Sequence, residues 1–200
     1  MNRRGAMNNG PSLRASRFSC LPLNDHFDGT GLTARDGLAE GTLNIWGNSL
    51  PAEELPVPGS VVTVGGVPFL FPASNSARGD NLRCRSQRLL VPSGRWDWLH
   101  VLCTAERRTE DPLLVEYAEG TTREQWLRVS DFWPETPPRF GELLAFRCGQ
   151  LNYPQHAQHG MIPSIWAQRI PMTVPTGIRG VQLPENPAMH LFALTLQAQP

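Results

Sequence analysis

The sequence contains no lysine, and all 18 of its basic residues are arginine. They are balanced by 18 acidic residues, so the formal net charge is zero. A nucleic-acid-binding surface, or electrostatic attachment to an anionic membrane, normally requires an excess of positive charge. The charge balance therefore argues against both, and we expect neither nucleic acid nor a membrane as a partner.

Long apolar stretches are missing as well. No segment approaches the ~20 apolar residues of a membrane-spanning helix. Residues 1–20 include several arginines but lack the apolar core, about seven to fifteen residues long, of a secretory signal peptide. We therefore expect a cytoplasmic protein in which residues 1–20 form a disordered N-terminal leader and residues 21–200 form a single domain.

The sequence also lacks the motifs that identify common reactions. Its four cysteines show no C-x-x-C spacing, so a zinc ribbon or redox-active dithiol is unsupported. Cys103 falls inside an apolar segment and Cys148 follows one, which is typical of buried free thiols. A nucleophile elbow, a P-loop and a dinucleotide-binding fingerprint are absent.

Proline and glycine are abundant instead, with 19 and 18 residues that interrupt the chain every few positions. Such interruptions exclude long helices but suit short strands joined by turns. Apolar segments recur about every ten residues, which predicts an all-β protein with an antiparallel jelly-roll β-sandwich. The strands expected after residue 80 cover 88–92, 96–105, 112–118, 125–132, 142–147, 165–174, 177–183 and 190–196.

Before these strands, the longest apolar run with strand character is SVVTVGGVPFLFP, residues 60–72. Gly65 and Gly66 predict a bulge or tight corner within it. Its two prolines cannot donate ladder hydrogen bonds, so we expect an edge strand or a kinked pair of short strands. We also expect a short strand at 45–46, a helical turn at 51–55 and a long loop at 152–163.

Three stretches together resemble a known family: VVTVGGVPFLFP from Val61, WDWLHVLCTA from Trp96 and GVQLPENPAMHLFALTL from Gly180. They are similar to the galactose-binding-like, carbohydrate-binding β-sandwich modules appended to bacterial glycoside hydrolases. The resemblance implies a jelly roll closed by a hairpin of Leu183-Pro184 and residues 190–196, with a carbohydrate as partner. It also implies a structural Ca²⁺, for which Asp25 and Asp28 are the candidate ligands, and no other cofactor.

Six tryptophans are many for a domain of this size, and aromatic faces stack on sugars and other flat apolar ligands. Trp46, Trp133 and Trp166 lie beside turns or polar residues, so they are candidate ligand contacts. Arg83, at a strand end, is a candidate for binding a carboxylate. The structural alternatives are tryptophans that fill the space between the sheets and an arginine in a surface ion pair.

His156 and His159 lie three residues apart in the predicted loop, and imidazole is well suited to proton transfer near neutral pH. Together with Asp131 they are the candidate catalytic residues. The same pair could hold a metal if another loop supplied a third ligand. His100 lies on a packed strand, where it is either a hydrogen-bonded core residue or part of a pocket.

Two functions follow from these residues. The first is a module that binds a carbohydrate or another small molecule through loop tryptophans and polar side chains. The second is a small free-standing enzyme, of the non-redox cyclase, isomerase or lyase type, with a Trp, His and Asp pocket. A shallow groove floored by tryptophan favours the first, whereas a deep pocket with a histidine or acid of perturbed pKa favours the second.

Overall fold

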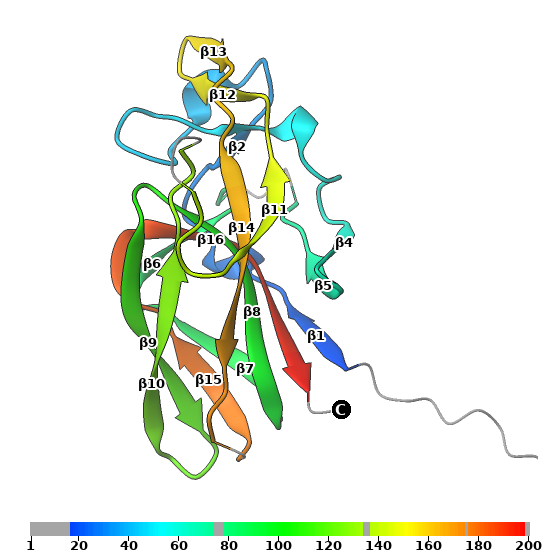
Figure 1. Cartoon of the computed structure of the whole chain (residues 1–200), viewed down its shortest axis with the longest axis vertical. Coiled ribbons are helices and arrows are strands. Elements are labelled where there is room, and N and C mark those ends of the chain that lie inside the picture. Colours follow the sequence, from blue (N-terminus) through cyan, green and yellow to red (C-terminus); the bar gives the residue numbers. More distant parts are fainter. Residues whose placement is uncertain (1–16, 74–77, 134–136, 175, 199–200) are drawn as a thin grey trace, which may run out of the picture.

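The computed structural model describes residues 17–73, 78–133, 137–174 and 176–198. Within these ranges the chain forms two antiparallel sheets that stack as a sandwich (Figure 1). This confirms the predicted all-β jelly-roll fold. Among the described residues, no helix has the length and apolar character that a membrane crossing requires.

The larger sheet has six strands in the order β1-β16-β8-β14-β11, with β6 paired to the first half of β16. The long strand β16 therefore pairs with β1, β6 and β8. The strands of this sheet are β1 (Phe18–Leu21), β6 (Leu82–Arg85), β8 (Trp96–Ala105), β11 (Leu143–Arg147), β14 (Ser164–Pro171) and β16 (Glu185–Ala198).

The smaller sheet has four strands in the order β10-β9-β15-β7. They are β7 (Arg88–Gly94), β9 (Thr109–Tyr117), β10 (Thr122–Val129) and β15 (Ile178–Gln182). The side chains between the two sheets form the main core, which includes Val101 and Cys103 of β8 and Leu191 and Leu194 of β16. Since side chains alternate along a strand, Leu102 of β8 points to the opposite face.

That opposite face of the six-stranded sheet carries a second layer, the outer layer. It contains three two-stranded pairs: parallel β2–β3, the β4–β5 hairpin and the β12–β13 hairpin. These strands are β2 (Leu32–Thr33), β3 (Leu50–Pro51), β4 (Val61–Val64), β5 (Val67–Leu70), β12 (Gln150–Tyr153) and β13 (His156–His159). Two short 3-10 helices complete it: η2 (Leu38–Glu40) and η3 (Ala52–Glu54). A further 3-10 helix, η1 (Asn24–His26), lies between Leu23 and Phe27, which pack in the main core.

The outer layer has its own apolar core against the sheet. Phe69 lies in β5 and Phe71 directly follows it. Both are buried in one cluster with Leu102, Phe192 and Ile165. Both faces of β8 and β16 are therefore covered, which explains why apolar residues occur on both faces of these strands. The run at 60–72 thus belongs to this layer, as the predicted pair of short strands.

Several sequence predictions are wrong in detail. β15 and β16 do not form the hairpin that the family resemblance implied, because β15 pairs with β7 and β9 while β16 lies in the other sheet. The segment between them, at Leu183-Pro184, crosses from one sheet to the other. The predicted loop at 152–163 contains β13 and the end of β12, which pair through Tyr153 and His156.

The segment at 45–46 forms a turn rather than a strand. The Asn44 carbonyl oxygen Oδ1 accepts hydrogen bonds from the backbone N–H groups of Trp46 and Asn48, at 3.1 and 3.2 Å, which holds the chain in a tight reversal. The predicted helical turn at 51–55 is present as η3, but Ser49 does not cap it. The Ser49 hydroxyl instead lies 2.6 Å from the Thr33 hydroxyl.

The domain boundary also moves. β1 begins at Phe18, inside the segment predicted as a leader, and pairs with β16 from Phe18 opposite Gln197 to Leu21 opposite Leu194. The sandwich therefore starts three residues earlier than the predicted Leu21, because these residues complete the edge of the six-stranded sheet. The remainder of the predicted leader, residues 1–16, lies outside the described residues.

Candidate functional site

A pocket of about 400 Å³ opens in the outer layer, and we call it the acidic pocket. Three carboxylates line it, from Asp36, Glu40 and Asp80, and no basic side chain is found among its described lining residues. Its apolar surface comes from Phe71 and from the prolines Pro56, Pro58 and Pro72. The other lining residues are Thr30, Leu32, Thr33, Ala34, Gly37, Ala52 and Gly79.

Asp80 is the deepest of the three carboxylates, with only 6% of the residue exposed. Its Oδ1 accepts hydrogen bonds from the Gly31 N–H at 2.7 Å and the Asn81 amide at 3.1 Å, and its Oδ2 accepts from the Leu32 N–H at 3.0 Å. These bonds favour the charged form, but burial outweighs them and raises the pKa of Asp80 to about 6. The carboxyl can therefore gain and lose a proton near neutral pH.

The backbone around Asp80 is closely packed, which explains the glycines in this part of the sequence. Gly79 has a φ of +101° and approaches Gly29 so closely that a Cβ there would lie 2.0 Å from the Gly29 carbonyl oxygen. The N–H groups of Asp80 and Asn81 both donate to that oxygen. Glycine at position 79 thus lets the chain turn and place the Asp80 side chain against residues 31–32.

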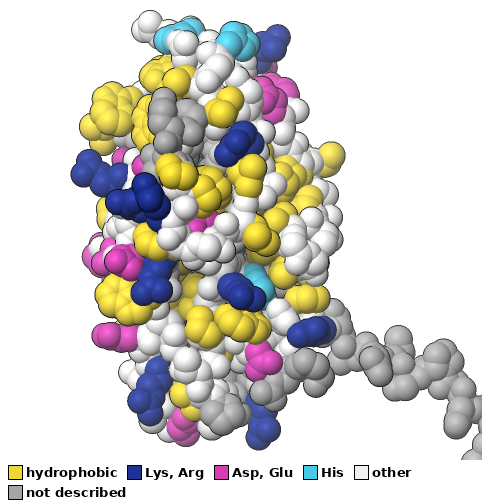
Figure 2. All heavy atoms as spheres, viewed as in Figure 1, with side chains coloured by type: hydrophobic (Ala, Val, Ile, Leu, Met, Phe, Trp, Pro, Cys, Tyr) yellow, Lys and Arg dark blue, Asp and Glu magenta, His cyan; other side chains and the backbone are white. Residues whose placement is uncertain are grey.

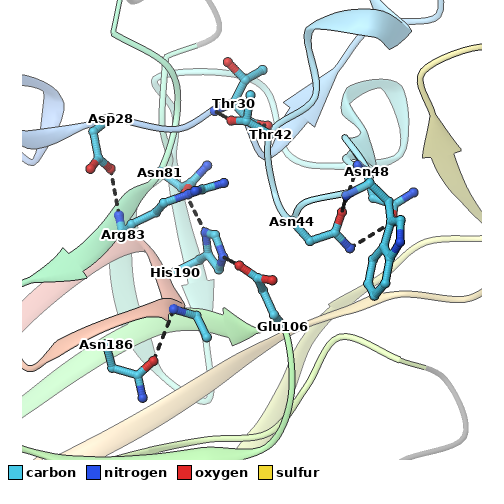
Figure 3. Close-up of polar contacts among 12 residues, drawn as sticks. Asp28, Thr30, Thr42, Asn44, Asn48, Asn81, Arg83, Glu106, Asn186 and His190 are labelled. Carbon is cyan, nitrogen blue, oxygen red and sulfur yellow. Dashed lines mark hydrogen bonds and ion pairs between the residues drawn. The ribbon is translucent and has the colours of Figure 1, made fainter.

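A polar chain runs from Asp80 through Asn81 and His190 to Glu106, and Figure 3 shows its last three members. Asn81 donates to Asp80 through its amide nitrogen, and its carbonyl oxygen lies 2.9 Å from Nδ1 of His190. The His190 Nε2 lies 3.8 Å from the Oε1 of Glu106. Burial is the largest influence on the pKa of His190 and lowers it, and the Arg83 charge lowers it further, whereas the contact with Glu106 acts in the opposite direction. The imidazole is therefore neutral at pH 7, and Nδ1 donates to Asn81.

Arg83 and Asp28 border this chain, as Figure 3 shows. The Asp28 carboxylate accepts from the Arg83 backbone N–H at 2.8 Å and lies 3.8 Å from the Arg85 guanidinium. The predicted carboxylate-binding residue Arg83 is partly exposed, lies opposite His190 in the pairing of β6 with β16, and does not line the acidic pocket. Asp25 lies on η1, and its carbonyl oxygen accepts from Arg78.

No three His, Cys, Asp or Glu side chains in the described parts of the chain are grouped closely enough to hold a metal ion. Asp28 has its oxygens directed at arginine and at a backbone N–H, as described above. A calcium ion on Asp25 and Asp28 stays a prediction from the family resemblance. The donor set around them offers two carboxylates, whereas Ca²⁺ takes about six to eight oxygen ligands.

The three predicted catalytic residues are not brought together. His156 and His159 lie on β13, the exposed strand of the β12–β13 hairpin, where the His156 ring stacks on Tyr153 with a centroid separation of 5.1 Å. Figure 2 shows histidine side chains gathered at this end of the molecule. Asp131 is buried elsewhere, next to β8, where it forms a bridge with Ala105.

The three predicted tryptophan contacts have different environments. Trp166 is 2% exposed, and its indole N–H donates to the Asp131 carbonyl oxygen at 2.9 Å, so it fills the core and presents no face to a ligand. Trp133 is partly buried and stacks on Phe132 at 4.9 Å. Trp46 is 61% exposed at the Asn44 turn. None of the three lines the acidic pocket.

A second pocket, of about 290 Å³, lies beside the β4–β5 hairpin, and we call it the hairpin pocket. It contains His100 and Arg169, on neighbouring strands of the six-stranded sheet. Both alternatives that the sequence left open for His100 apply, because the residue is buried and hydrogen-bonded to Gln197 and also lines this pocket. The pocket shares no lining residue with the acidic pocket.

The sequence alone did not single out Asp80 or Glu40. The available signal was the segment Arg78-Gly79-Asp80-Asn81, in which an acid and an amide directly follow a glycine in a polar loop. Asx residues after glycine commonly hydrogen-bond to nearby backbone. What the sequence could not provide was the contact of this segment with residues 29–32, about fifty positions earlier.

These observations define a β-sandwich protein that carries its pockets on an added outer layer. The family comparison agrees, because a model described as the AziU2-like beta-sandwich domain matches residues 18–200. The chain belongs to this family. No curated protein matches the chain. The resemblance to carbohydrate-binding sandwiches is therefore confirmed at the level of the β-sandwich.

Proposed function

We propose that the protein binds a small polyhydroxylated molecule in the acidic pocket, with a preference for one that carries an ammonium group. The supporting observation is the set of three carboxylates, Asp36, Glu40 and Asp80, in a pocket of about 400 Å³ without a described basic lining residue. Carboxylate oxygens accept hydrogen bonds from hydroxyl groups and attract cations. The proline and phenylalanine surfaces suit the apolar face of a sugar ring.

The test is calorimetric titration of the full chain with glucosamine, glucose and N-acetylglucosamine at pH 7. We expect glucosamine to bind best, because only it carries a positive charge. The double variant Asp36→Asn/Glu40→Gln should weaken glucosamine binding about tenfold, since two partly exposed ion pairs are lost. The control Glu110→Gln/Glu124→Gln, on β9 and β10, should bind as the wild type does.

Two outcomes would contradict the proposal. One is equal affinity for the charged and uncharged sugars, which would mean that the carboxylates do not select the ligand. The other is equal weakening in the control variant, which would mean that overall charge is responsible rather than the pocket. Failure of all three sugars to bind at millimolar concentration also counts against a carbohydrate ligand.

A second candidate function is non-redox acid–base catalysis in the same pocket, as a cyclase, isomerase or lyase would perform. The observation that favours it is the pKa of Asp80, raised to about 6 by burial, because a carboxyl that titrates near the working pH can both donate and accept a proton. Proton NMR spectroscopy of the sugar after incubation separates the two functions, because it distinguishes isomers that have the same mass. A changed product that is lost in Asp80→Asn supports catalysis, and an unchanged ligand supports binding alone.

A further inference from the structure

The hairpin pocket combines apolar walls with a small number of polar groups. Its walls come from the β4–β5 hairpin and from the neighbouring edge of the six-stranded sheet. The apolar lining residues are Val64, Val67, Phe69, Leu143 and Ala167. The polar side chains that line it are those of His100 and Arg169, with Gly65 and Gly141 completing the rim. Gln168 also borders the pocket, but its side chain points to the other face of the sheet, where its amide donates to the Arg128 carbonyl oxygen. An apolar site with a few convergent polar groups is typical of a small-molecule pocket.

Arg169 supplies a positive charge without a carboxylate partner among the described residues. Its guanidinium lies over the Trp98 ring, 4.7 Å from the ring centroid. Stacking occupies one face of the planar group and leaves its N–H edges available. Those edges match the two oxygens of a carboxylate, whereas Arg88, Arg128 and Arg179 of the other sheet already pair with glutamates.

His100 contributes a hydrogen-bond donor to the same pocket. The side-chain amide of Gln197 has suitable hydrogen-bond partners for both its atoms in one of its two orientations. In that orientation its nitrogen donates to Nε2 of His100 at 2.8 Å, and its oxygen accepts from the Arg17 guanidinium at 2.6 and 3.2 Å. Nε2 is then the acceptor of the ring, so the proton of the neutral imidazole is on Nδ1. Burial, the largest influence, lowers the pKa of His100 and keeps the ring neutral.

We propose that the hairpin pocket binds a small molecule with a single carboxylate on an apolar body. The Arg169 guanidinium and the His100 Nδ1–H donate to the carboxylate. The apolar body packs against Phe69, Val67 and Leu143. This site is independent of the acidic pocket, which would repel a carboxylate ligand, so the two can be tested separately.

The test uses cinnamate and its uncharged amide, cinnamamide, which have nearly the same shape. Calorimetric titration of the full chain at pH 7 should show cinnamate binding at least about tenfold more tightly than cinnamamide, since only the carboxylate engages the charged donor. Arg169→Gln should remove this preference. The matched control Arg179→Gln, on β15 of the other sheet, should leave it intact.

A second variant tests the location without altering charge. Ala167→Leu places extra methyl groups in the pocket, so it should weaken both compounds, and the His100 imidazole resonances of the wild type should shift on addition of cinnamate. Equal affinity for cinnamate and cinnamamide would overturn the proposal, as would binding that survives in both Arg169→Gln and Ala167→Leu. No binding of either compound at millimolar concentration would overturn it too.

Discussion

At the scale of single residues, Asp80 links the acidic pocket to the interior of the fold. Its carboxylate is nearly buried and yet borders the pocket, while Asn81 connects it to His190. Its hydrogen bonds to neighbouring groups affect the stability of the fold, and its charge affects which ligands the pocket binds. Its titration should therefore be visible in both stability and binding.

Because burial raises the pKa of Asp80 from 3.8 to about 6, the folded state holds this proton more tightly than the unfolded state does. The stabilising contribution of the proton is complete below pH 4 and is lost as the pH rises through about 6. We expect the free energy of unfolding of the wild type, relative to Asp80→Asn, to fall by about 2 kcal/mol between pH 4 and pH 7. Urea denaturation across this range measures it, and a relative free energy that stays constant or rises would contradict the assignment.

At the scale of structural elements, the β4–β5 hairpin forms one wall of the hairpin pocket and buries Phe69 against the sheet. Its turn, Gly65-Gly66, has φ values of +57° and +82°. Successive positive φ angles are the mark of the type I′ turn that suits a two-residue hairpin. The glycine pair therefore sets the geometry of the hairpin.

Replacing Gly65 by alanine should be costly. Its φ is +57°, and a Cβ there would lie 2.7 Å from the Leu143 side chain across the pocket. We expect Gly65→Ala to lower the free energy of unfolding by about 1–2 kcal/mol, the usual cost of a left-handed residue with a side chain. The control Gly149→Ala has no positive φ and finds its nearest neighbour at 3.5 Å, so its urea midpoint should stay close to that of the wild type. Equal losses in both variants would refute the turn argument.

The elements were predictable from the sequence where apolar residues mark them. The segment 96–105 is β8 as predicted, because its residues are apolar on both faces. The hairpin β12–β13 was missed because its second strand, His156–His159, is almost entirely polar and gives no apolar alternation. Leu183-Pro184 was misread as part of a hairpin because an apolar strand pattern does not tell which sheet a strand joins.

The candidate site was less predictable than the fold for a related reason. Asp36 and Glu40 lie close together, at a turn and in η2, but Asp80 comes from a segment about forty positions later that meets them only in the folded chain. The tryptophans and histidines were selected as candidates by their residue types alone. Trp166 illustrates the difference, because the indole that looked suited to a ligand is needed to fill the core and to bond Asp131. Burial depends on long-range contacts that a local pattern does not specify.

At the scale of the whole molecule, the sandwich and its outer layer enclose most of the cysteines. All four are free thiols, and Cys84, Cys103 and Cys148 are buried, while Cys20 is partly exposed. Burial raises the pKa of each buried thiol, to about 12 for Cys148. They are thus protonated and inaccessible at pH 8.

We therefore expect Ellman's reagent at pH 8 to modify only Cys20 in the native protein, and slowly, with all four thiols reacting in urea. The variant Cys20→Ser should abolish the native reaction. Rapid modification of two or more thiols without denaturant would show that the outer layer does not cover the sheet as described.

The most direct test of the acidic pocket is a map of backbone amide shifts in the ¹⁵N-labelled protein on titration with glucosamine. The account predicts that the largest changes fall at Gly31, Leu32, Gly37 and Asp80, and that the Trp46 indole and the β12–β13 hairpin stay unchanged. Changes confined to Trp46 or to His156 and His159 would contradict binding in the acidic pocket. They would instead support a site at the tryptophan and the histidines that the sequence suggested.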